Sequence, residues 1–183
     1  MTTFADVTGR YPHREVIPVR EFDSKGPRSE GSPVVWAGRE SGPALVVVDP
    51  AGAARHDELP ATWDGLAAHF QVAWCRIPAS KRTIEDVEDV FETLAERRAP
   101  ANLVAAGQAC PAALALARQF GDIVTSVLLV DPPEGGETLA ESDIEVRVVA
   151  RSHVGPSDRV EAPLPLGHPE VVAGLVTALA GMT

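Results

Sequence analysis

Hydrophobic residues in this chain gather in short continuous runs that are separated by segments of helical spacing. The runs that predict strands cover residues 34–37, 44–48, 72–75, 102–106, 124–130 and 146–150. Run 44–48, Ala-Leu-Val-Val-Val, contains no polar residue at all. An unbroken apolar run of this kind is typical of a strand that is buried on both faces of a parallel sheet.

The segments between these runs carry apolar residues at spacings of three and four. Helices are predicted over residues 62–70, 83–98, 111–120 and from 169 onward. In the second of these, Thr83 and Asp86 have the spacing of a capping box. Strands that alternate with helices form βαβ units, so the pattern predicts a three-layer α/β/α sandwich around a mainly parallel sheet.

The first 33 residues differ from the rest of the chain. They contain one extended-looking stretch, 16–19, followed by a run over 23–33 that is rich in Gly, Pro and Ser. A chain of 183 residues is long enough for one domain with a substantial core and short for two. We therefore expect an N-terminal arm, residues 1–33, and a single domain over residues 34–183.

The amino-acid composition indicates which kinds of partner and which cellular compartment to expect. Against 16 Lys and Arg stand 26 Asp and Glu, a net charge of −10, which disfavours nucleic acids and anionic membrane surfaces. No apolar run approaches the roughly 18 residues of a membrane span, and the N-terminus lacks the apolar core of a signal peptide. An acidic cytoplasmic protein is expected. The two cysteines, the five histidines and the glycines show no spacing of a metal or phosphate site, so no metal and no cofactor are predicted.

The segment 102–117 combines a predicted strand, a glycine-containing turn and a helix. Its sequence, Asn-Leu-Val-Ala-Ala-Gly-Gln-Ala-Cys-Pro-Ala-Ala-Leu-Ala-Leu-Ala, resembles the strand–elbow–helix unit of the α/β-hydrolase superfamily. There a Gly-x-Ser-x-Gly turn raises the nucleophilic serine above the sheet. Aligned with that motif, Gly107 takes the first glycine, Gln108 the next position, Ala109 the place of the serine and Pro111 the second glycine. The resemblance implies that the serine is absent.

The flanking segments resemble the same family in the same order along the chain. They match its second and third strands (36–50), first helix and fourth strand (63–76), the helix before the elbow (83–98), sixth strand (126–133) and the histidine turn with the last helix (167–171). Only residues 131–145 lie between the sixth and seventh strands, which leaves no room for a helical lid. The resemblance therefore implies a minimal α/β-hydrolase fold without a cap domain.

The resemblance also points to candidates for the other catalytic groups. His168, before the last helix, would be the base, although a histidine bonded to the backbone of a helix N-terminus fits equally well. Asp131, after the sixth strand, would be the acid, or else a turn-forming residue before two prolines; Asp158 is a further acid near the seventh strand. Cys110, beside Ala109, is a displaced nucleophile or a buried apolar residue.

The residues after the third strand would line the ligand cleft together with Gln108 and Ala109. Pro50 has no N–H to stabilise an oxyanion, so Ala51 would have to donate in its place. Asp49 brings a carboxylate to the same rim, which disfavours a developing negative charge nearby. Both features argue against ordinary esterase chemistry.

Two functions follow from these residues. The first is a non-catalytic member of the fold that serves as a scaffold or binds a small molecule or a protein, including a second copy of itself or a catalytic homologue. The alternative is a serine-independent hydrolase or lyase acting on a small ester-like or thioester-like substrate. It would use His168 with Asp131 as a base, or Cys110 as a thiol nucleophile.

Overall fold

The computed structural model describes residues 32–50, 58–76, 83–135, 143–153 and 162–181. Nearly all of the predicted N-terminal arm lies outside these ranges, as do Ala51 and Asp158. Within them, no helix is both long enough and apolar enough to cross a membrane.

A six-stranded sheet forms the centre of the described part of the chain. Its strands are β1 (Val34–Gly38), β2 (Ala44–Asp49), β3 (Gln71–Arg76), β4 (Ala101–Ala106), β5 (Val124–Val130) and β6 (Glu145–Ala150). They lie in the order β1-β3-β2-β4-β5-β6. Strand β1 pairs antiparallel with β3, and every other pair is parallel. The strands predicted from the apolar runs are confirmed, with ends that shift by a residue or two.

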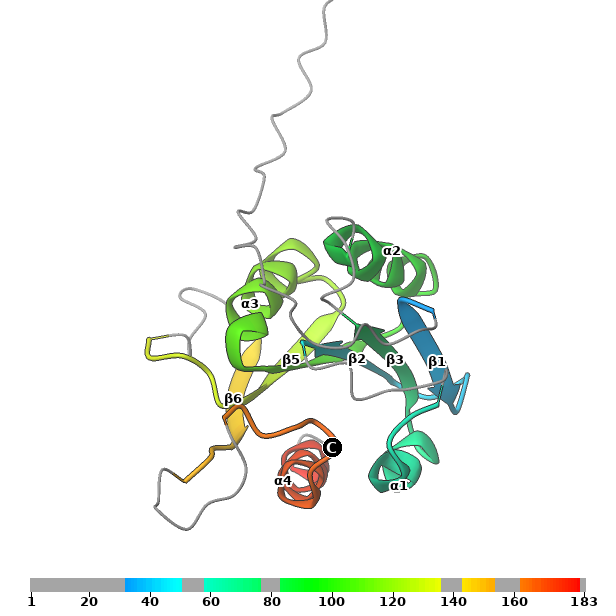
Figure 1. Cartoon of the computed structure of the whole chain (residues 1–183). Coiled ribbons are helices and arrows are strands. Elements are labelled where there is room, and N and C mark those ends of the chain that lie inside the picture. The colour runs from blue at the N-terminus through cyan, green and yellow to red at the C-terminus, as the bar shows by residue number, and fades with distance from the viewer. Residues whose placement is uncertain (1–31, 51–57, 77–82, 136–142, 154–161, 182–183) are drawn as a thin grey trace, which may run out of the picture.

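Helices cover both faces of this sheet (Figure 1). They are α1 (Asp64–Ala67) with the 3-10 turn η1 (Ala61–Trp63) before it, α2 (Thr83–Glu96), α3 (Cys110–Gln119) and α4 (Pro169–Ala180). Helices α2 and α3 lie on one face, and α1 and α4 on the other. The predicted three-layer sandwich is therefore confirmed, although the first helix is shorter than the predicted 62–70.

Alternate residues of the central strands enter two separate cores. In β2, Val46 and Val48 pack toward α2 and α3, while Leu45 and Val47 pack toward α1 and α4. Successive side chains of a strand point to opposite faces, so a strand covered on both sides must be apolar throughout. This explains why the apolar runs are continuous rather than alternating.

Helix α4 approaches β6 unusually closely at Gly174. A Cβ atom on this glycine would lie 2.3 Å from the carbonyl oxygen of Val149 in β6. Because the neighbour is backbone, it cannot move aside without shifting the strand. Gly174 therefore sets the distance between α4 and the sheet.

We predict that Gly174→Ala destabilises the protein although alanine is the better helix former. The clash should outweigh the roughly 1 kcal/mol gain in helix propensity and leave a net loss of about 1–3 kcal/mol. Gly65→Ala in α1 is the matched control, since a Cβ there meets nothing within 4 Å. Urea unfolding measures the free energy of unfolding of both variants. If Gly174→Ala is as stable as Gly65→Ala, α4 can shift away from the sheet without cost.

Candidate functional site

The turn after β4 is the predicted elbow, and its sharp bend lies at Gly107. This buried residue has φ +51°, in the left-handed region that glycine adopts without steric cost. Ala109, the predicted nucleophile position, instead has φ −79° and ψ −16° and caps the start of α3. The bend therefore lies two residues earlier than the predicted position. The small residues Ala105 and Ala109 flank Gly107 as the motif's two glycines flank its central residue.

The space in front of Gly107 is occupied. A Cβ atom built on Gly107 would lie 2.8 Å from Cγ and 3.1 Å from Cβ of Pro163. Pro163 belongs to the stretch between β6 and α4, which we call the crossing segment (residues 162–168). A side chain at the bend would need this proline ring to move.

Asp131 holds the crossing segment in place. Its carboxylate accepts hydrogen bonds from the backbone N–H and the hydroxyl of Ser152, after β6, and from the N–H of Leu164, at 2.7 Å. Asp131 itself has φ +46°, a conformation that Asp tolerates better than most residues. The residue predicted as a catalytic acid thus connects the ends of β5 and β6 to the crossing segment.

The crossing segment is also bonded to η1. The indole N–H of Trp63 donates to the carbonyl of Leu166 at 2.8 Å, and the Thr62 hydroxyl donates to the carbonyl of Gly167 at 2.9 Å. Leu164 and Leu166 are both buried in the core on the α4 side. These contacts join residues about a hundred positions apart and leave the crossing segment little freedom above β4.

His168 ends the crossing segment and caps α4. Its side-chain Nδ1 accepts a hydrogen bond from the N–H of Glu170 at 3.3 Å, and its backbone N–H donates to the carbonyl of Pro165 at 2.8 Å. A side chain that accepts from the first turn stabilises the helix N-terminus. Among the described residues, no hydrogen bond joins His168 to Asp131 or to Cys110. The predicted base and acid are therefore not brought together as a pair.

Cys110 is fully buried at the start of α3. Its Sγ makes weak contacts to the carbonyls of Ala105, at 3.7 Å, and Val130, at 3.8 Å. Burial raises the pKa of the thiol to about 12, and the negative charge of Asp131 acts in the same direction. Since the thiolate is the reactive form, these surroundings suppress nucleophilic chemistry.

The predicted cleft residues divide between the interior and the surface. Asp49 is fully buried at the end of β2, where its Oδ2 accepts from the indole N–H of Trp74 at 2.8 Å. Its register partner on β3 is Arg76, which is also buried. Pro50 is half-buried and Gln108 exposed. Asp49 therefore belongs to the packed interior of the described structure.

Sequence reasoning missed Pro163, Ser152 and Leu164. The signal for the first was present, because prolines 163 and 165 bracket Leu164 and favour an extended backbone. Nothing local indicates that this stretch returns to β4. Gly107 lies 56 positions before its neighbour Pro163, and Asp131 lies 33 positions before its partner Leu164.

Strand order and the bend identify the fold. Strand β3 lies between β1 and β2, β1 alone is antiparallel, and the central strand β4 leads through a left-handed bend into α3. The chain has the α/β-hydrolase fold. The predicted absence of a lid concerns the connection from β5 to β6, part of which, residues 136–142, lies outside the described residues.

No family model and no curated protein matches the chain. Solved structures of this fold do match. They include a Bacillus subtilis protein described as a putative hydrolase (TM-score 0.43, 15% identity, 54% of this chain and 38% of that one). A bacterial membrane phospholipase A gives TM-score 0.42, 18% identity and coverage of 55% and 36%. The enol-lactonase from Burkholderia xenovorans matches with a TM-score of 0.38 and 21% identity, and the match covers 54% of this chain and 42% of that one.

The chain spans about two fifths of the length of these solved structures. At such low identity and structural similarity, their activities and substrates are properties of those proteins alone.

Removing the Asp131 carboxylate tests its structural role. We expect Asp131→Ala to lower the free energy of unfolding by about 2–4 kcal/mol, because three donors lose a charged acceptor. Asp122→Ala, an exposed acid in the turn before β5, should change it by less than about 0.5 kcal/mol. Thermal and urea unfolding measure both variants. Equal stabilities would contradict the role of Asp131 as the anchor of the crossing segment.

Both thiols should be inert in the folded protein. Burial raises the pKa of Cys75, like that of Cys110, to about 12. At pH 8 only about one molecule in ten thousand would then carry each thiolate, compared with roughly a quarter for a free cysteine of pKa 8.5. Ellman's reagent should therefore label no thiol in native protein and two after denaturation. Fast labelling of native protein, abolished by Cys110→Ala, would show that Cys110 is reactive.

Proposed function

We propose that this chain is a non-catalytic α/β-hydrolase-fold protein whose role is to bind a partner or ligand or to act as a scaffold. The observation that carries the proposal is the pairing of Gly107 with Pro163. At the bend where this fold presents its nucleophile, the chain has a residue without a side chain, and a proline ring fills the space in front of it.

The other catalytic positions support the same conclusion. Acyl transfer needs a base oriented by an acid and within reach of the nucleophile. Here the Asp131 carboxylate accepts from Ser152 and Leu164, and the His168 imidazole caps α4. Both groups perform structural work that catalysis would interrupt.

The serine-independent alternative has less support. A thiol nucleophile at Cys110 would have to leave a fully buried position and lose a proton that burial holds with a pKa of about 12. A base at His168 would need its Nδ1 freed from Glu170. No described contact favours either rearrangement.

Hydrolysis assays test the proposal directly. We expect the full chain to give no turnover above buffer with p-nitrophenyl acetate, p-nitrophenyl butyrate or short-chain thioesters. Gly107→Ser should also be inactive, because its Cβ would meet Pro163 and the serine would lack a paired base and acid. Circular dichroism verifies that Gly107→Ser is folded, so that its inactivity cannot result from unfolding.

Histidine variants provide the matched control. Wild-type turnover that His168→Ala abolishes and His69→Ala preserves would contradict the proposal, since His69 is an exposed histidine at the end of the α1 region. Turnover abolished by Cys110→Ala would instead establish the thiol enzyme. Absence of turnover in every variant supports the non-catalytic reading.

A further inference from the structure

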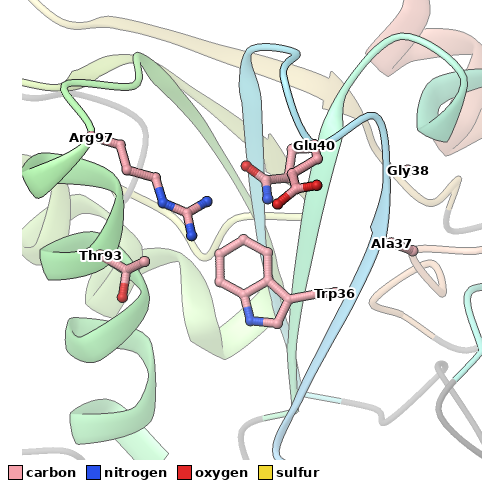
Figure 2. A pocket seen from close by; sticks show the side chains of 7 residues that line it. Trp36, Ala37, Gly38, Glu40, Thr93 and Arg97 are labelled. Carbon is pink, nitrogen blue, oxygen red and sulfur yellow. The ribbon is translucent and has the colours of Figure 1, made fainter.

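A groove runs between β1 and α2, at the opposite side of the sheet from the crossing segment. It consists of two adjoining hollows of about 390 and 200 Å³ that share Trp36 of β1 and Thr93 of α2. The larger hollow also contains Glu40 and Arg97. Figure 2 shows the Trp36 ring pointing from β1 toward α2, with Thr93 and Arg97 on the helix side and Glu40 across from them. We call this hollow surface the edge groove.

Trp36 is the most distinctive residue of the edge groove. Its side chain is 42% exposed, whereas the other two tryptophans, Trp63 and Trp74, are fully buried. Tryptophan is enriched among the residues that dominate binding energies at interfaces, where it fills a pocket away from water. A tryptophan held beside a ready-made hollow is therefore a candidate anchor for a partner.

Strand β1 adds a second feature, since it lies at one edge of the sheet. Within the part of the chain that the structure describes, β1 pairs only with β3. An edge strand offers a row of backbone donors and acceptors, and recognition domains use such edges to bind extended peptides as an added strand. Side chains of that strand would alternate, and every second one would point toward the edge groove.

Charge is distributed unevenly along the edge groove. Asp86 and Asp89 line the smaller hollow together with Val34, and Arg97 lies in the larger one beside Glu40. Arg97 follows the last residue of α2 and is eight positions after Asp89, about 12 Å along the helix axis at 1.5 Å per residue. This exceeds the roughly 8 Å screening length at physiological salt. The end near Val34 is therefore acidic and electrostatically separate from Arg97.

We propose that the edge groove binds an extended, basic peptide segment of a partner protein. The segment adds antiparallel to β1, the more stable pairing for an edge. It places an apolar side chain against Trp36 and a Lys or Arg beside Asp86 and Asp89. Because Val34 precedes Trp36 by two residues and an antiparallel strand runs the other way, the basic residue follows the apolar one by two positions. The recognised pattern is apolar-x-basic.

A second copy of this chain is the less suitable occupant. Each copy carries a net charge of −10, so two copies repel, and the groove that they would share has three acids against one base. A basic peptide can occupy the same hollow and brings a positive charge to Asp86 and Asp89. The edge groove would be the surface that binds the partner, so this proposal rests on the proposed binding function.

Trp36 supplies the readout for the test, because it is the exposed tryptophan among three. The full chain is titrated with a capped ten-residue peptide that carries Leu-Thr-Lys at its centre between Thr and Val residues. Binding should protect tryptophan emission from acrylamide quenching. The Leu-Thr-Glu peptide should bind at least about fivefold more weakly, as expected for reversing one exposed charge pair.

Variants locate the contact, with isothermal titration calorimetry as a readout that needs no tryptophan. Trp36→Ala should weaken binding roughly thirtyfold, the effect of losing an anchor worth about 2 kcal/mol. Asp89→Lys should remove or invert the preference for Lys over Glu. Val176→Ser, at the other large apolar side chain that is exposed within the described residues, should leave affinity unchanged.

Several outcomes would overturn the inference. One is failure of the Leu-Thr-Lys peptide to bind at millimolar concentration; another is binding of that peptide that Trp36→Ala and Asp89→Lys leave unchanged. A dimer in sedimentation experiments that Trp36→Ala dissociates would assign the groove to a second copy instead. None of these results bears on hydrolysis, whereas ester turnover would refute the proposed function even if the peptide binds. The two failures are therefore distinguishable.

Discussion

The Asp131 carboxylate is the contact on which the arrangement above the sheet depends. By accepting from Ser152 and Leu164 it ties the ends of two parallel strands to the crossing segment, which has no regular secondary structure of its own. The crossing segment in turn brings Pro163 over Gly107 and delivers His168 to the start of α4. A hydrogen bond to a charged acceptor contributes more to stability than a bond between neutral groups. The Asp131 bonds therefore hold the crossing segment more strongly than its neutral bonds to Thr62 and Trp63.

The three residues that the resemblance assigns to catalysis all bond to backbone groups in this structure. Asp131 accepts from the N–H of Leu164, His168 accepts from the N–H of Glu170, and the Cys110 thiol donates to the carbonyl of Ala105. A carboxylate that joins strand ends and an imidazole that caps a helix both stabilise the native state in the absence of any substrate. These contacts support the proposed non-catalytic role.

Binding and catalysis would then use different surfaces. The carboxyl ends of the strands, where open α/β sheets place their ligands, are crossed by residues 162–168 near β4. The edge groove lies instead along β1 and α2, with an exposed tryptophan and an acidic end. A surface of that kind suits protein recognition, because its energy comes from an edge strand and one aromatic anchor rather than from an enclosed pocket.

The sequence by itself determined the layered fold and much of the strand pattern. Continuous apolar runs such as 44–48 require burial on both faces, and the helical spacing between them supplies the covering layers. It also indicated that no serine stands in the segment 102–117. The sequence placed the bend at Ala109, whereas the backbone angle φ places it at Gly107, because Ala105 and Ala109 can flank the bend in place of the motif's glycines. The tertiary structure alone decided that Pro163 covers Gly107, that Asp131 bonds to Leu164 and that Trp36 stays exposed. These features depend on contacts between residues far apart in the chain, which no local pattern encodes.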